Sequence, residues 1–257
     1  MEPTYQNIFD SHAHYDAQQF GKDRTELLTS LPAQGVKYIL NAASDIKSAK
    51  ASINMAEAYP YIYAAAGVHP HEAKDAPKDL TQKLTELLSH PKVKALGEIG
   101  LDYHYNFSPK EIQQRVFEEQ LTLARELDLP VIVHDREAHR DTLVLLKKYK
   151  PAGVVHCYSG SAEMAQELVK LGLYIGFTGV VTFKNAKKVL EAVGAVPLER
   201  LLIETDCPYM APEPMRGRRC DSSLLPYTAA AIAREKGLDT QALIDQTTQN
   251  ALELYRI

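Results

Sequence analysis

The chain has 257 residues, a length typical of one (β/α)₈ barrel and greater than that of most other single domains. Hydrophobic residues make up 45% of it and charged residues 24%, which favours a soluble globular protein with a sizeable core. The formal net charge of −4 excludes a general basic field that attracts nucleic acid, so an anionic substrate needs local cations, either metal ions or an arginine cluster.

Short β-rich runs alternate with longer amphipathic runs along the whole chain. We expect strands at residues 7–12, 36–41, 62–68, 93–98, 131–134, 153–156, 174–177 and 201–206. We expect helices near 22–33, 45–58, 78–89, 110–127, 137–149, 161–171, 184–194 and 221–236, and a final helix at 239–254 that covers one end. Parallel neighbours need a crossover, usually a helix, so this alternation indicates a parallel sheet. Eight repeats favour an α/β fold of the TIM (β/α)₈ barrel type over an open doubly wound sheet, with residues 1–257 as a single domain.

Six residues of the types that bind metals stand at the carboxyl ends of five expected strands. They are His12, His14, Glu98, His134, His156 and Asp206. TIM barrels carry their active sites at this end, so we expect the six side chains to meet in an open, solvent-filled site. His12 and His14 are two residues apart on one strand, so both imidazoles point to the same side and can chelate one ion.

This ligand set predicts a two-metal centre. Imidazole together with carboxylate suits zinc or manganese, and magnesium is the third candidate for the two divalent ions. We expect Glu98 to bridge the ions, with His12, His14 and Asp206 on one of them. His134 and His156 then bind the other. Such a pair activates water for a displacement reaction, in which Asp206 serves as ligand and general base.

Six sequence motifs resemble the TatD family of metal-dependent deoxyribonucleases. They are DSHAHYD (10–16), GVHPHEA (67–73), GEIGLDYH (97–104), PVIVHDR (130–136), HCYSG (156–160) and ETDCPYMAPEPMRGRR (204–219). The resemblance implies a TIM barrel, a DNA substrate, phosphodiester hydrolysis and often 3′→5′ exonuclease action. It also implies metal binding by the six residues named above and places Glu204, with Glu98 and Asp206, among the catalytic residues. One departure stands in the last motif, where Cys220 follows Arg219 and the family commonly has asparagine.

Further side chains are candidates for substrate contact because they follow strand ends on the same face. They are His69, His71, Asp102, Tyr158, Arg218 and Arg219. Asp102 is also placed to orient a ligand histidine. Tyr158 is a candidate for stacking on a base, and the arginines belong to a basic cluster whose planar guanidinium groups suit phosphate.

Three other interpretations remain open: a small-molecule amidohydrolase, a phosphoesterase acting on small esters, and a non-catalytic metal-binding barrel. Many related two-metal barrels bridge their ions with a modified lysine at the end of the fourth strand, and Glu98 in that place favours the TatD-like interpretation. The absence of a secretory signal pattern and of a long apolar run predicts a cytoplasmic protein without a membrane partner. The oligomeric state is left open, a monomer being compatible with the sequence.

Overall fold

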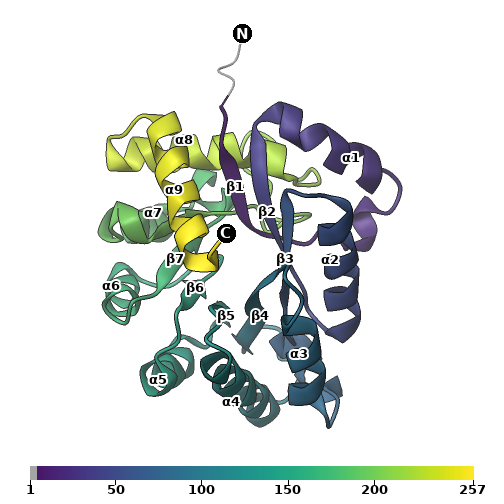
Figure 1. Ribbon diagram of the computed structural model, residues 1–257. Coiled ribbons are helices and arrows are strands. Elements are labelled where there is room, and N and C mark those ends of the chain that lie inside the picture. Colours follow the sequence, from purple (N-terminus) through teal and green to yellow (C-terminus); the bar gives the residue numbers. More distant parts are fainter. Residues whose placement is uncertain (1–4) are drawn as a thin grey trace.

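Eight parallel strands in sequential order form one sheet in the computed structural model, which describes residues 5–257 (Figure 1). The strands are β1 (Ile8–Ala13), β2 (Val36–Ala42), β3 (Ile62–Ala66), β4 (Val93–Asp102), β5 (Val131–Arg136), β6 (Gly153–Val155), β7 (Tyr174–Phe177) and β8 (Leu201–Ile203). Each pairs in parallel with the next along the chain, and the sheet curls until β8 lies beside β1. The predicted TIM barrel is confirmed.

A helix follows each strand and packs outside the sheet. The α-helices are α1 (Arg24–Ser30), α2 (Ile46–Ala58), α3 (Leu80–Leu88), α4 (Lys110–Glu126), α5 (His139–Tyr149), α6 (Ala162–Lys170), α7 (Lys187–Ala195), α8 (Leu225–Lys236) and α9 (Thr240–Tyr255). Local signals begin several of them: Asp45 forms a capping box with Ser48 before α2, and Ser161 caps α6 by accepting from the Met164 backbone N–H. These starts fix where each connecting loop leaves the carboxyl end of its strand.

The junction between β1 and β8 closes the barrel with little regular strand pairing, because β8 has only three residues. The buried carboxylate of Asp10 supplies hydrogen bonds across this junction, where backbone pairing between β1 and β8 is largely missing. It accepts hydrogen bonds from the Thr205 backbone N–H (3.0 Å), the Thr205 hydroxyl (2.6 Å) and the Ser222 hydroxyl (2.6 Å). Directly beyond it, the Asp206 N–H donates to the His12 carbonyl at 3.0 Å. The junction therefore sets the position of two predicted ligands.

The end of the barrel opposite these ligands is sealed by α9, which crosses in front of the strands in Figure 1. Inward-facing residues of the strands, such as Phe9 and Ile132, form one buried cluster with Leu254 and Tyr255 of α9. The predicted final helix over one end is thus present. With this end filled by side chains, access to the barrel axis is left to the carboxyl ends of the strands.

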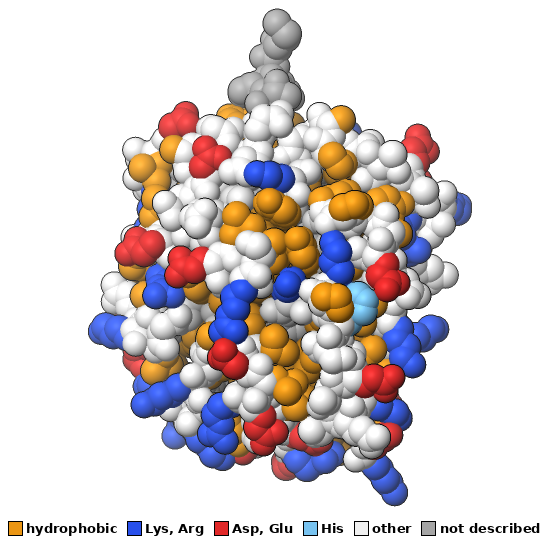
Figure 2. All heavy atoms as spheres, viewed as in Figure 1, with side chains coloured by type: hydrophobic (Ala, Val, Ile, Leu, Met, Phe, Trp, Pro, Cys, Tyr) orange, Lys and Arg blue, Asp and Glu red, His pale blue; other side chains and the backbone are white. Residues whose placement is uncertain are grey.

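The face carrying α9 offers no long track for a polyanion. Lys and Arg side chains are interspersed there with Asp and Glu side chains among the described residues (Figure 2). No helix within residues 5–257 combines the length and the apolar character of a membrane span.

Candidate metal centre

The six predicted ligands converge at the carboxyl end of the barrel, with the Glu98 carboxylate between them. Its Oε1 lies 2.9 Å from His134 Nδ1 and 2.8 Å from His156 Nε2. Its Oε2 lies 3.4 Å from His12 Nε2 and 3.5 Å from His14 Nε2. Each oxygen of Glu98 therefore faces a different pair of imidazoles, which is the arrangement that a bridging carboxylate requires.

Asp206 completes the group on the His12 side. Its Oδ1 lies 3.3 Å from His14 Nε2 and 3.8 Å from His12 Nε2, and these two nitrogens are 3.1 Å apart. Asp206 adopts a left-handed backbone conformation with φ of 56°, just beyond the end of β8. A non-glycine residue in this region is uncommon and is held by its surroundings, in this case by the bonds at the β1–β8 junction.

The centre is more enclosed than the expected open site. His12, Glu98 and His156 are buried, while His14, His134 and Asp206 are partly exposed and form the rim. Burial alone would raise the pKa of Glu98, but the charge of His156, together with hydrogen bonds from His12 and His134, holds it well below the usual range. Asp206 likewise keeps a lowered pKa despite burial, because His14 bonds to it. Both carboxylates are therefore ionised in the range where metals bind.

The donor set fits divalent cations. His14 Nδ1–H donates to the Ala42 carbonyl at 2.9 Å, which turns Nε2 inward as the nitrogen available to a metal once its proton is displaced. His134 directs Nε2–H to Asp102 Oδ2 at 3.1 Å, which turns Nδ1 toward Glu98 Oε1 at 2.9 Å. Within residues 5–257, neither Glu98 nor Asp206 forms an ion pair with Lys or Arg. Positive charge from metal ions matches this concentration of lone pairs and carboxylates.

His69 lies closer to the centre than a loop residue is expected to lie. Its Nε2 is 3.3 Å from Glu98 Oε1, so the ring belongs to the same cluster as Glu98 and His134. Its Nδ1 accepts a hydrogen bond from the His71 backbone N–H, and burial lowers the pKa of His69 to about 4. The ring is therefore neutral with its proton on Nε2, so His69 is a hydrogen-bond donor facing the centre.

Asp102 and His71 stand behind His134. Asp102 is buried and accepts from His134 Nε2 and from His71 Nε2, the latter at 2.8 Å. This geometry orients the ring of His134, one of the two roles expected of Asp102, whereas its burial keeps it from substrate. His71 is partly exposed and remains a candidate for substrate contact.

Glu204 and Tyr158 occupy other places than expected from the sequence. Glu204 is fully buried, with Oε1 at 3.6 Å from His156 Nδ1, and so has the geometry of a positioning residue. A Cβ at Gly176 would lie 2.5 Å from Glu204 Oε2, so glycine at that position leaves room for the carboxylate. Tyr158 is buried against Phe177, and its hydroxyl donates to the Ser161 carbonyl at 2.7 Å, so its ring offers no surface to a base.

The two predicted arginines differ in their surroundings. Arg219 forms a two-pronged ion pair with Asp23 (2.7 and 2.5 Å), and its guanidinium lies over the Phe20 ring. This ion pair connects the β8–α8 loop to the start of α1. It also occupies the guanidinium N–H groups that would otherwise bind a phosphate. Arg218 is exposed and forms no side-chain hydrogen bond or ion pair with the described residues.

Sequence reasoning missed an aromatic pair beside the centre. Tyr105 and Phe107 lie in the β4–α4 loop, exposed and next to His71. The signal was present in the sequence, since three aromatic residues, Tyr103, Tyr105 and Phe107, alternate with polar residues after Asp102. Asp10, which closes the barrel, was also missed as a site residue because it precedes the His12 and His14 pair inside a strand.

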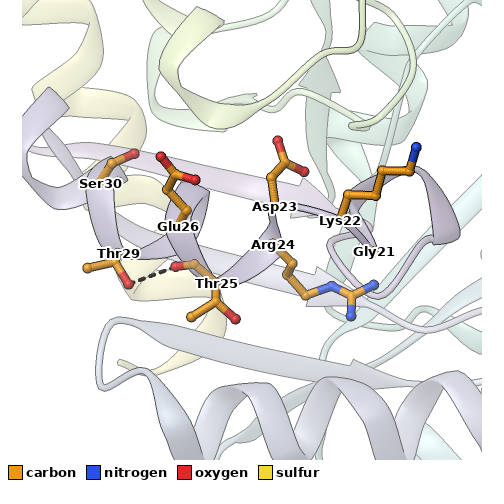
Figure 3. Close-up of a pocket in the computed structure, with 8 residues that line it drawn as sticks. All are labelled: Gly21, Lys22, Asp23, Arg24, Thr25, Glu26, Thr29 and Ser30. Carbon is orange, nitrogen blue, oxygen red and sulfur yellow. Dashed lines mark hydrogen bonds between the residues drawn. The ribbon is translucent and has the colours of Figure 1, made fainter.

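A separate surface hollow lies along α1, away from the centre. It is lined by one continuous segment, from Gly21 to Ser30 (Figure 3). Lys22, Asp23 and Glu26 point to one side of the segment, and Arg24 points to the other. Arg24 donates to the backbone carbonyls of residues 15–17. The lining side chains do not converge, so the hollow is not a candidate site.

Comparison with known proteins agrees with this geometry. A family model described as TatD related DNase matches residues 9–256. The uncharacterized metal-dependent hydrolase YabD of Bacillus subtilis is 43% identical, over 97% of this chain and 99% of the relative. The 3′-5′ ssDNA/RNA exonuclease TatD of Salmonella typhimurium is 36% identical, over 97% and 99%. The crystal structure of YJJV, a TatD homolog from Escherichia coli, superposes with a TM-score of 0.92 at 30% identity, covering 98% of each chain. The chain therefore belongs to the TatD family of metal-dependent hydrolases.

Proposed function

We propose that this protein is a metal-dependent phosphodiesterase that removes nucleotides from single-stranded DNA ends, with 3′→5′ polarity. The observation that carries the proposal is the Glu98 carboxylate, whose two oxygens face separate pairs of imidazoles. The relative from Salmonella typhimurium, named as a 3′-5′ exonuclease on ssDNA and RNA, supports the substrate class and the polarity.

Two divalent ions are the proposed cofactors. His12, His14 and Asp206 would hold one and His134 and His156 the other, with Glu98 shared between them. When bound, such ions activate water near neutral pH and stabilise the attacking and leaving oxygens of a phosphodiester.

The remaining chemistry belongs to the side chains. Asp206 lies at the rim with Oδ1 turned to His14, and we assign proton transfer from the attacking water to its carboxylate. His69 directs its Nε2 proton toward the centre, where it can donate to a phosphate oxygen. Asp102 holds the ring of His134 from behind by a hydrogen bond, which preserves ligand geometry, and the Glu204 carboxylate lies 3.6 Å behind His156 Nδ1.

Turnover of end-labelled oligonucleotides tests the proposal. Purified protein is stripped of metal, reloaded with manganese, magnesium or zinc, and given 5′-labelled single-stranded DNA, duplex DNA and RNA. We expect progressive shortening of the 5′-labelled single strand, loss of activity with a chelator and recovery with metal. Activity that survives complete metal removal, or release of label from the 5′ end, contradicts the mechanism or the polarity.

Matched variants and substrates sharpen this test. Glu98→Gln keeps the side-chain volume and removes the bridging charge, so we expect turnover to fall by orders of magnitude. Glu26→Gln makes the same chemical change at an exposed position on α1 and is expected to keep wild-type turnover. A lactone and a small phosphate monoester serve as rival substrates. Efficient turnover of either, with none of DNA or RNA, would favour a small-molecule hydrolase.

A further inference from the structure

Two large aromatic side chains are exposed side by side near the candidate centre. Tyr105 is 48% exposed and Phe107 is 57% exposed. Their ring centroids are 5.3 Å apart and the planes are tilted by 26°, so the rings stack on each other. A scattered exposed apolar residue is ordinary, but in a stacked pair each ring covers one face of the other, and the more exposed ring, Phe107, turns its outer face to solvent. Such a surface favours a ligand that is itself flat.

The loop carrying the pair is anchored at both ends. Ser108 is buried, donates to the His71 carbonyl at 2.8 Å and accepts from the Lys74 backbone N–H at 3.0 Å. Gln113 of α4 accepts from the Asp102 N–H and donates to the Ser108 carbonyl, each at 2.8 Å. Tyr105 N–H donates to the Asp102 carboxylate. These bonds fix the aromatic pair relative to the metal centre.

Only one ring separates the pair from the proposed ligands. The His71 centroid lies 4.8 Å from that of Phe107, 5.5 Å from that of Tyr105 and 6.2 Å from that of His134. His71 and His134 also share Asp102 as acceptor. A ligand lying on the aromatic pair is therefore a neighbour of any group bound at the centre.

A cation adjoins the pair on its Tyr105 side. The Arg136 guanidinium lies over the Tyr105 ring, 4.9 Å from its centroid, and Arg136 ends β5 two residues after His134. Guanidinium suits a phosphate oxygen, while the aromatic rings suit a base. Flat aromatic surface and positive charge, both adjoining a proposed phosphodiester centre, match the parts of a nucleotide.

We infer that Tyr105 and Phe107 form a stacking platform for the base next to the phosphodiester bond being cleaved. The inference rests on the proposed function and adds the means by which substrate is held and aligned. Stacking accepts every base because each has a π-face, so the platform gives affinity without sequence preference. It also selects single strands, because a base inside a duplex is already stacked on its neighbours.

Steady-state kinetics on matched oligonucleotides tests the platform. Phe107→Ala and Tyr105→Ala are each compared with wild type on a single strand carrying all bases and on one with an abasic residue at the 3′ end. We expect each variant to raise KM for the intact strand by a factor of roughly 5 to 150, the range for loss of one base-stacking contact. For the abasic strand, we expect the KM of wild type to rise by the same factor. The KM of each variant should then be little higher than that of wild type.

Control variants separate stacking from general apolar contact. Phe107→Trp keeps a π-face and should retain the low KM. Phe107→Leu keeps the apolar volume without the ring, so its KM should rise as in Phe107→Ala. Val144→Ala removes a side chain that is 56% exposed on α5 and should leave KM unchanged. Equal losses on intact and abasic strands would overturn the platform, because the effect would not depend on the base.

A binding experiment keeps this inference apart from the proposed function. A single strand with 2-aminopurine at its 3′ end is added to metal-loaded Glu98→Gln protein, and we expect its fluorescence to be quenched by stacking. The added change Phe107→Leu should abolish the quenching. Cleavage by wild type without this quenching rejects the platform alone. Quenching without cleavage rejects the proposed function alone, and the absence of both rejects the two together.

Discussion

Each imidazole at the rim of the centre has one nitrogen committed to the protein and the other turned inward. His14 gives its Nδ1 proton to the Ala42 carbonyl, and His134 gives its Nε2 proton to Asp102. These outer partners decide which nitrogen is available to a metal. The residue types alone therefore predict the ligands, while the choice of nitrogen follows from backbone and carboxylate positions that only the fold supplies.

His14 links metal binding to pH. Burial would lower its pKa, but Asp206 and Glu98 raise the pKa of His14 to about 9 in the metal-free protein. This raised pKa contributes stability that is full below the unfolded pKa of about 6.5 and is lost as pH rises through about 9. Metal binding near neutral pH must therefore displace this proton.

Titration calorimetry in two buffers of different ionisation enthalpy measures the displaced protons. We expect at least one proton per chain to be released near pH 7, and the number to fall as the pH passes about 9. His14→Gln should reduce the release, since glutamine carries no titrating group. A proton count that stays constant across this range would contradict the assignment.

Residue type near a strand end predicted which side chains gather, although His14, His156 and Asp206 lie just past the ends of their strands. Tyr158 and Glu204 follow β6 and β8 in the same loops, and their burial was not predicted. Backbone φ is 56° at Asp206, which turns the chain in a way that no alternating pattern predicts. Residue type and strand position thus predicted which residues gather, while burial and partners depended on the loops.

At the scale of elements, the sequence predicted every strand and α-helix to within a few residues. The main difference lies at β4, which continues past Glu98 to Asp102 because it pairs with β5 over that length. Ile99 and Leu101 continue the apolar alternation past Glu98, but Gly100 between them is atypical of a strand interior, so the predicted strand ended too early. The short 3₁₀ helix Pro70–Asp75, which positions His71, was likewise not expected.

The β1–β8 junction makes a prediction about stability. Thr205 donates its backbone N–H and its hydroxyl to Asp10, and its hydroxyl also accepts from the Cys207 N–H. Thr205→Val keeps the shape and removes the hydroxyl, leaving buried polar groups without partners at a cost of about 1–3 kcal/mol. Urea unfolding of the metal-free protein measures this difference.

Thr205→Ser is the matched control, because it restores the hydroxyl and loses only a methyl group. We expect it to recover part of the stability that Thr205→Val loses. Unchanged unfolding of Thr205→Val would mean that Asp10 does not hold the junction through this side chain.

At the scale of the whole molecule, local contacts must hold the substrate, since the net charge is −4. Arg218 has no side-chain partner within residues 5–257 and is available to a phosphate, whereas Arg219 is engaged with Asp23. We expect Arg218→Ala to raise KM for DNA more than it lowers kcat. Arg219→Ala should leave KM near the wild-type value and change stability by less than about 1 kcal/mol, as for other exposed ion pairs. A rise in KM for Arg219→Ala as large as that for Arg218→Ala would show that Arg219 contacts the substrate.

The same charge balance predicts a weak dependence of DNA binding on salt. Each phosphate neutralised on a single strand contributes a slope of roughly 0.7 to the fall of log affinity with log salt, so two or three contacts predict about 1.5 to 2. Arg136 and Arg218 are the proposed protein contacts, and the scissile phosphate is the contact made by the bound metal ions.

Fluorescence anisotropy of metal-loaded Glu98→Gln protein with a labelled single strand, from low to moderate salt, measures the slope. Arg218→Ala should lower the slope by about 0.7, whereas Arg219→Ala should not change it. A slope several times larger would require an extended basic track elsewhere on the surface, and such a track would favour cutting within long strands over digestion from an end.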